Sequence, residues 1–140
     1  MPLNNILVDS SYLYAVLDEK NDKHEIATAV SELYRGQFIV PYVVLTEVAY
    51  LFNRESGVHA VLKFLDKLRT MQPILEPVTY DDLDRVREIM ASYQDARFDF
   101  VDCCIMAISE RLRCTEVCTF DRRDFSIFRP KHVSHLELLP

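Results

Sequence analysis

Short apolar runs alternate along the chain with amphipathic segments. The runs are rich in β-branched residues and predict buried strands at 5–8, 38–40 and 116–120, an extended edge segment at 73–78 and a last short strand within 133–139. Between them, apolar residues recur every three to four positions and predict helices at 12–17, 24–34, 41–52, 56–69, 83–93 and 99–112. This alternation indicates an α/β fold with three layers, in which helices flank a central, mostly parallel sheet of four to five strands.

Local residues mark several helix ends. Gly36 is expected to stop the second helix and Pro41 to open the third. Thr79 and Asp82 have the spacing of a capping box, with aspartate in place of glutamate. Five residues of the helix 56–69 are expected to face inward: Val58, Val61, Leu62, Leu65 and Leu68.

Two of the predicted helices carry a carboxylate among apolar neighbours. Asp102 lies within the apolar segment 100–108, and Asp99 precedes it by about one helical turn on the same face. Glu47 has only apolar residues three and four positions away on either side. Because an unpaired buried carboxylate is costly, each needs a partner, which is an arginine, a set of backbone donors or a metal ion.

Two further carboxylates directly follow predicted strands. Asp9 stands between a strand and a helix, so it is either a helix cap or a ligand at the carboxyl end of a strand, and Asp121 follows the run 116–120 in the same way. A divalent cation would relieve the repulsion between Asp9, Glu47 and Asp102 in a shared core. An all-oxygen donor set favours Mg²⁺ or Mn²⁺.

The cysteines and histidines are not needed for such a site. Cys103 and Cys104 are adjacent in apolar sequence and are expected to be reduced core residues. Cys114, Cys118, His132 and His135 loosely resemble a zinc site, but the histidine spacing is shorter than usual. The simpler interpretation is a core cysteine and surface histidines.

Composition narrows the class of protein. The 140 residues suffice for one domain, and 49% hydrophobic with 27% charged residues is typical of a globular protein. No apolar run approaches the roughly 20 residues of a membrane span, and the N-terminus lacks the pattern of a signal peptide, so the expected location is the cytoplasm. Neither a glycine-rich phosphate loop nor a Gly-x-Ser-x-Gly elbow occurs.

Charge is distributed unevenly. A net charge of −6 is unusual for a nucleic-acid binder, although acids gathered around a metal would account for part of it. Basic residues are concentrated in the last third of the chain: Arg97, Arg111, Arg113, Arg122, Arg123, Arg129 and Lys131. This asymmetry leaves nucleic acid open as a ligand without arguing for it.

Four segments together resemble the acidic motifs of PIN domains, and most closely those of VapC-type toxins. They are Ile-Leu-Val-Asp-Ser-Ser at 6–11, Leu-Thr-Glu-Val at 45–48, Phe-Asp-Phe-Val-Asp at 98–102 and Thr-Phe-Asp-Arg-Arg-Asp-Phe at 119–125. Each motif alone is weak, but the ordered set is specific and spans nearly the whole chain. The resemblance implies a PIN-like fold and a metal-dependent ribonuclease, the toxin of a VapBC-type toxin–antitoxin pair.

The resemblance also implies roles for individual residues. Asp9, Glu47, Asp102 and Asp121 match the family's catalytic quartet, and Asp99 matches an extra acid of some members. Mg²⁺ or Mn²⁺ would be held by Asp9 and Asp102, with Asp121 or Asp99 completing the shell and Glu47 orienting or deprotonating the attacking water. Ser11 and Thr119 match supporting hydroxyl residues beside the first and last acids. Hydrolysis would leave a 5′-phosphate and a 3′-hydroxyl.

The expected partners follow from the same resemblance. They are an RNA substrate, an antitoxin that covers the acidic site, and a second copy of the chain paired through the apolar surface of the helices 41–52 and 56–69. Two alternatives compete. One is a PIN-like module that binds RNA or protein without cleaving it. The other is a phospho-acceptor receiver domain, which is disfavoured because only one acid follows the first strand and no lysine ends the last.

Overall fold

Five short strands form the centre of the protein, and their apolar sequences reflect burial between two layers of helices. The computed structural model describes residues 5–34 and 37–140. The strands are β1 (Asn5–Val8), β2 (Gln37–Pro41), β3 (Ile74–Glu76), β4 (Glu116–Cys118) and β5 (Glu137–Leu139). All pairs are parallel and the strand order is β3-β2-β1-β4-β5. The predicted α/β fold with a central parallel sheet is therefore confirmed, and the segment 73–78 does supply an edge strand.

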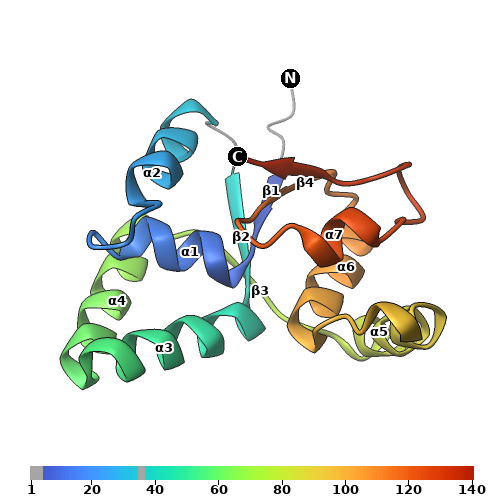
Figure 1. The fold of residues 1–140 in the computed structure, drawn as a ribbon, viewed down its shortest axis with the longest axis horizontal. Helices are drawn as coiled ribbons and strands as arrows, with labels where there is room; N and C mark the ends of the chain where they lie inside the picture. The colour runs from blue at the N-terminus through green and yellow to red at the C-terminus, as the bar shows by residue number, and fades with distance from the viewer. Residues whose placement is uncertain (1–4, 35–36) are drawn as a thin grey trace.

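Helices cover both faces of the sheet (Figure 1). One layer contains α1 (Ser10–Leu17), α2 (His24–Leu33), α3 (Tyr42–Ser56) and α4 (Val58–Met71). The other contains α5 (Tyr80–Ser92), α6 (Phe100–Leu112) and the short α7 (Arg123–Ile127), with a 3₁₀ turn, η1 (Gln94–Ala96), between α5 and α6. No helix among residues 5–34 and 37–140 is long and apolar enough to cross a membrane.

The predicted helix ends are mostly where expected. Thr79 and Asp82 form a complete capping box at the start of α5, with reciprocal hydrogen bonds of 3.1 and 3.0 Å. Pro41 immediately precedes α3, and Gly57, at φ 80°, separates α3 from α4. The stop predicted at Gly36 lies outside the described residues.

The predicted inward face of α4 is right for two of its five residues, Val61 and Leu68, which pack partly buried against the core, and wrong for the other three. Val58, Leu62 and Leu65 are each more than half exposed, and Phe64 is the one residue of the helix that is fully buried. The physical reason is the position of α4 at the margin of its layer, where it contacts α3 and presents only a narrow strip to the core. Phe64 stacks on Phe52 of α3 with ring centroids 5.6 Å apart.

Helix α6 is the most deeply packed helix, because it lies between the sheet and α5. Residues 103–109 are all buried, and all four cysteines are free and buried, as expected of core residues. His132 donates from Nε2 to the carbonyl of Cys114 at 2.6 Å. Among the described residues, no group of three or more His, Cys, Asp or Glu side chains is arranged to hold a metal ion.

Candidate active site

The order of the strands places a reversal of the sheet topology between β1 and β4, and we call the region outside the carboxyl ends of these two strands the crevice. The chain proceeds from β1 outward to β2 and β3, and then returns to the other side of β1 as β4 and β5. Open α/β sheets bind ligands at such a reversal, outside the carboxyl ends of the strands. Asp9 follows β1, while Thr119 and Asp121 follow β4, so both segments meet at this crevice.

Asp9 is buried and held by three donors. It caps α1 by accepting the Tyr12 N–H at 3.0 Å, and the same oxygen accepts the Ser11 hydroxyl at 2.8 Å. Its other oxygen accepts a short hydrogen bond from the Thr119 hydroxyl. The helix-cap interpretation of Asp9 is therefore correct, and the cap fixes its carboxylate at the crevice.

The two hydroxyl residues also tie the segment after β4 to the start of α1. Ser11 Oγ accepts the backbone N–H of Phe120, and Thr119 Oγ1 accepts that of Asp121, both at 2.9 Å. The supporting positions predicted for Ser11 and Thr119 are thus occupied by groups that order both the first acid and the loop that carries the last. Asp121 itself is exposed.

Glu47 reaches the crevice through a neighbour of Asp9. Ser10 donates a short hydrogen bond to Glu47 Oε1, which joins the start of α1 to α3. Glu47 is half-buried because the buried face of α3 consists of Val44, Val48 and Phe52, and Glu47 lies beside that face. The prediction that Glu47 points into the apolar stripe is therefore only partly right.

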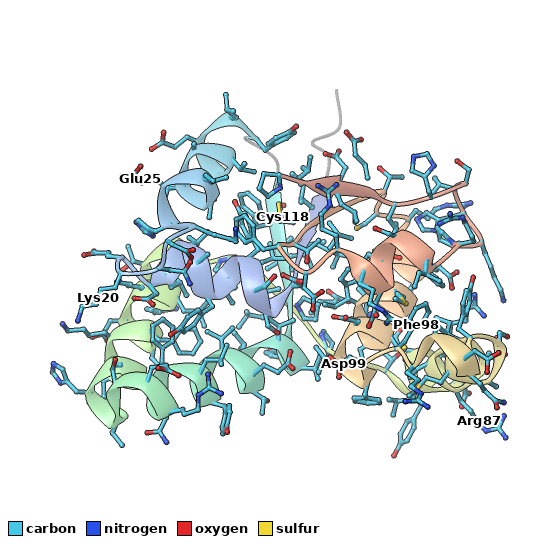
Figure 2. The ribbon with its side chains drawn as sticks, viewed as in Figure 1. Lys20, Glu25, Arg87, Phe98, Asp99 and Cys118 are labelled. Atoms are coloured by element: carbon cyan, nitrogen blue, oxygen red, sulfur yellow. The ribbon has the colours of Figure 1, made fainter. Side chains whose placement is uncertain are left out.

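Asp102 stands in the first turn of α6. It is half-buried rather than fully buried, because the helix begins at Phe100, which is itself 47% exposed. Asp99 is the exposed N-cap residue of α6, three positions before Asp102, and its charge acts on the Asp102 carboxyl. Figure 2 shows Asp99 where the chain enters α6, in the middle of the molecule between the helical layers.

A further acid, Asp124 of α7, is buried against this helix start. It accepts the backbone N–H of Asp99 at 3.0 Å and the guanidinium of Arg123 at 2.7 Å. Arg123 also donates to the carbonyl of Ala96 at 2.6 Å. Arg123 and Asp124 therefore fasten both sides of the turn that leads into α6.

Crowding of these acids controls their protonation. Burial raises the pKa of the Asp102 carboxyl to about 9, and a hydrogen bond with Asp124 and the charges of Asp9, Asp124 and Asp99 add to the rise. Burial also raises the pKa of Asp9 to about 6, against the opposing effect of its three hydrogen bonds, with a small contribution from Asp121. Asp9, Asp99, Asp102 and Asp121 thus share one electrostatic environment, to which Ser10 connects Glu47.

This donor set suits a hard divalent cation. The groups are carboxylates, and a cation beside Asp9 and Asp102 would offset the burial and the neighbouring negative charges that raise their pKa values. The absence of a three-ligand group among the described side chains is compatible with Mg²⁺, which is commonly held by one or two carboxylates and completes its shell with water and substrate phosphate.

Comparison with known proteins decides the family. The sequence model of the PIN domain matches residues 6–129 of this chain. The chain belongs to the PIN domain family. Ribonuclease VapC26 of Mycobacterium tuberculosis is 26% identical over 135 residues, which cover 96% of this chain and 100% of that protein.

Solved structures agree with this assignment at the level of the fold. VapC20 of Mycobacterium tuberculosis, described as a toxin that cleaves the sarcin–ricin loop, has a TM-score of 0.78 and 21% identity, over 91% of this chain and 98% of its own. The toxin–antitoxin complex of Klebsiella pneumoniae has a TM-score of 0.69 and 18% identity, over 88% of this chain and 92% of that chain. These TM-scores confirm the PIN-like fold that the motifs predicted.

Two polar residues of this PIN domain were missed by the sequence analysis. Ser10 appeared only within the first motif, 6–11, and nothing in the sequence indicates that its hydroxyl reaches Glu47, 37 positions away. Asp124 lies inside the recognised motif but follows no strand and has no apolar stripe around it. The available clues were its position three residues after Asp121 and the apolar residue that follows it, Phe125, which is buried in the structure.

Proposed function

We propose that this PIN domain is a metal-dependent endoribonuclease and the toxin of a VapBC-type pair. The observation that carries the proposal is the convergence of Asp9 and Asp102 at the crevice between β1 and β4, where burial and the charge of Asp9 both make deprotonation of Asp102 less favourable. The relatives named above, a ribonuclease and a toxin described as cleaving the sarcin–ricin loop, support ribonuclease activity for this chain.

The residues at the crevice would have different roles in phosphodiester hydrolysis. Asp9 and Asp102, with Asp121 or Asp99, would hold Mg²⁺ or Mn²⁺, which when bound supplies Lewis acidity toward the phosphate and the attacking water. Glu47, oriented by the Ser10 hydroxyl, is placed to position that water or take its proton. The amino-terminal ends of α1 and α6 contribute partial positive charge at the same crevice.

The proposal includes partners. Toxin–antitoxin complexes occur among proteins of this fold, which supports an antitoxin that covers the acidic crevice. The exposed apolar residues Tyr50, Leu62 and Leu65 of α3 and α4 give a homodimer a surface to bury. RNA of the cytoplasm would be the substrate.

Cleavage of RNA in the presence of Mn²⁺ tests the activity directly. A mixed set of structured and single-stranded RNAs is expected to be cut by the purified chain, with a 5′-phosphate on each product, and EDTA is expected to stop the reaction. Restoration of cleavage by excess Mn²⁺ after EDTA distinguishes metal removal from damage to the protein. Absence of both cleavage and Mn²⁺ binding would contradict the proposal and favour a non-catalytic PIN-like binding module.

Replacing Asp124 tests how the first turn of α6 is positioned. Asp124→Ala removes the acceptor for the Asp99 N–H and the partner of Arg123, so it is expected to lower kcat by about 10-fold to 100-fold through misplacement of Asp102. Asp124→Asn retains one acceptor oxygen and should keep more activity. Steady-state kinetics separates this loss from a change in KM, which should stay within about threefold because Asp124 is buried away from solvent. Equal and full activity of both variants would remove Asp124 from this role.

A further inference from the structure

A basic groove lies between α7 and the segment that leads into β5. It has a volume of about 390 Å³, and Arg122, Arg129 and His135 line it together with one acid, Glu137. The whole chain carries a net charge of −6, so this concentration of basic side chains contrasts with the average of the molecule. Arg122 and Arg129 belong to the basic residues that are concentrated in the last third of the sequence.

Backbone carbonyls hold the two arginines in place. Arg122 donates to the carbonyls of Pro140 and Leu138 at 3.1 and 3.3 Å, and Arg129 donates from Nη1 to the carbonyl of Ser126 at 2.7 Å. Within the described part of the chain, neither forms an ion pair with an Asp or Glu side chain. A guanidinium has five N–H donors, so each arginine retains donors for an anionic ligand.

Two arginines of the helical layer formed by α5 and α6 differ in this respect. Arg85 binds both oxygens of Glu110, at 2.6 and 3.1 Å, and Arg111 binds both oxygens of Asp82, at 2.9 and 3.0 Å. Their charges are used to fasten α5 to α6. Arg122 and Arg129 are exposed and carry charge that the fold does not neutralise in this way.

The groove shares a wall with the acidic crevice. Arg122 directly follows Asp121, and α7 presents Asp124 toward Asp102 while Ser126 of the same helix lines the groove. A nucleic-acid strand bound at the crevice continues beyond the bond being cut. The groove lies next to the crevice and offers guanidinium groups, which match phosphate geometry.

A second groove with basic side chains is less suited to this task. It has a volume of about 480 Å³ between the end of α1 and α4, and Lys20, Lys63 and Lys67 line it. Asp18 and Glu19 line it as well, and Lys67 lies 3.9 Å from Glu19. Lys20 stands at the margin of the molecule away from α7 (Figure 2).

We infer that Arg122 and Arg129 form a phosphate-binding surface that holds the RNA strand beside the acidic crevice. This inference rests on the proposed ribonuclease function and adds the surface that binds the substrate. Contacts to phosphate do not distinguish bases, so the groove contributes affinity and orientation rather than sequence preference. The salt dependence of binding is its physical signature, because each neutralised phosphate releases counterions.

Binding is measured in the catalytically impaired Asp102→Asn background, with a fluorescent single-stranded RNA of mixed sequence at several salt concentrations. Arg129→Ala is expected to raise Kd about 3-fold to 10-fold at low salt and to reduce the slope of log K against log salt by about 0.7. Arg122→Ala should act similarly, and the double variant more strongly. Arg129→Lys should retain most of the slope, because it retains the charge.

Two variants serve as matched controls. Arg87→Ala removes an exposed arginine from α5, and Lys63→Ala removes a lysine from the groove beside α4; both should leave Kd and slope unchanged. A melting temperature is recorded for every variant, since Arg122 also anchors residues 138 and 140. The hydrogen bonds of the Arg129 side chain go to the nearby carbonyls of residues 126 and 128, and its backbone N–H bond to Tyr93 is kept in Arg129→Ala, so the Arg129 variants report on RNA even if Arg122→Ala loses stability.

The outcomes separate this inference from the proposed function. If the unsubstituted chain cleaves RNA but Arg129→Ala keeps the full slope, the groove is not a phosphate site and the ribonuclease assignment stands. A loss confined to Lys63→Ala would likewise overturn the inference and place the strand in the other groove. If the unsubstituted chain neither cleaves nor binds RNA with Mn²⁺ present, this result contradicts both the proposed ribonuclease function and the assignment of the groove as a phosphate site.

Discussion

Replacing Asp102 with asparagine is expected to abolish RNA cleavage and to make the metal-free protein more stable. The loss of activity should be about 10³-fold or more, because the amide cannot supply the negative charge that the cation requires. The gain in stability follows first from the burial of Asp102, which disfavours its ionised form. The negative charges of Asp9, Asp99 and Asp124 disfavour that form further. An amide occupies the same space without that cost and can donate to Asp124.

The sign of the pH dependence follows from the raised pKa. Asp102 has an ordinary pKa of 3.8 in the unfolded chain and about 9 in the folded protein, so the folded state holds its proton more tightly. Stability contributed in this way is complete below about pH 4 and is lost as the pH rises toward 9. The difference in melting temperature between Asp102→Asn and the unsubstituted protein should therefore grow from pH 5 to pH 8, reaching about 3–10 °C.

Thermal unfolding in EDTA, paired with the cleavage assay, measures both effects. Asp66→Asn makes the same chemical change at an exposed position of α4 and should alter neither activity nor the melting temperature. Addition of Mn²⁺ should narrow or reverse the stability difference, because the cation stabilises only the chain that retains Asp102. Cleavage by Asp102→Asn at a near-normal rate would exclude Asp102 from the site.

Replacing Arg111 with alanine is expected to cause the largest loss of stability of a single surface-accessible side chain, about 3–5 kcal/mol. Arg111 of α6 binds both oxygens of Asp82, and a further N–H contacts Glu76 at 2.7 Å. Asp82 is only 2% exposed, so removal of the guanidinium leaves its charge buried and unpaired. Burial alone would raise the pKa of Asp82, but the hydrogen bonds from Arg111 and Thr79 outweigh it and hold the pKa below its ordinary value.

Urea unfolding at neutral pH measures the cost for Arg111→Ala. Arg87→Ala, on the exposed face of α5, is the matched control and should change the free energy of unfolding by less than about 0.5 kcal/mol. Adding Asp82→Asn to Arg111→Ala should recover part of the loss, since asparagine removes the stranded charge and can still cap α5. A loss below about 1 kcal/mol for Arg111→Ala would show that the pair does not fasten α5 to α6.

The fold was predictable because its signals are local. The apolar runs around Leu7, Ile39 and Val117 correspond to the three central strands, and the periodic segments correspond to the helices. The inward face of α4 was not predictable in the same way. Its apolar residues are periodic, but periodicity does not reveal that the helix lies at the margin of a layer and buries only Phe64.

The candidate site was predicted in part. Strand ends and interrupted apolar helices indicated Asp9, Asp102, Glu47 and Asp121, and the resemblance to PIN domains supplied their order. The partners of these acids depend on contacts between distant segments, as with Ser10 and Glu47. The distinction between half-buried and fully buried also depends on where α6 begins, and an apolar segment such as 100–108 does not fix that residue.

The pairing of β1 with β4 has a consequence for how the protein is made. β1 leaves the ribosome before β4, and the residue that completes the hydrogen bonds of Asp9 is Thr119, 110 positions later. A growing chain can pair β1 with β2 early, but it lacks the loop that contacts Asp9 until residues 119–121 have been synthesised. Under the proposed function, the ribosome that makes this toxin is therefore not exposed to an assembled nuclease site before those residues have emerged.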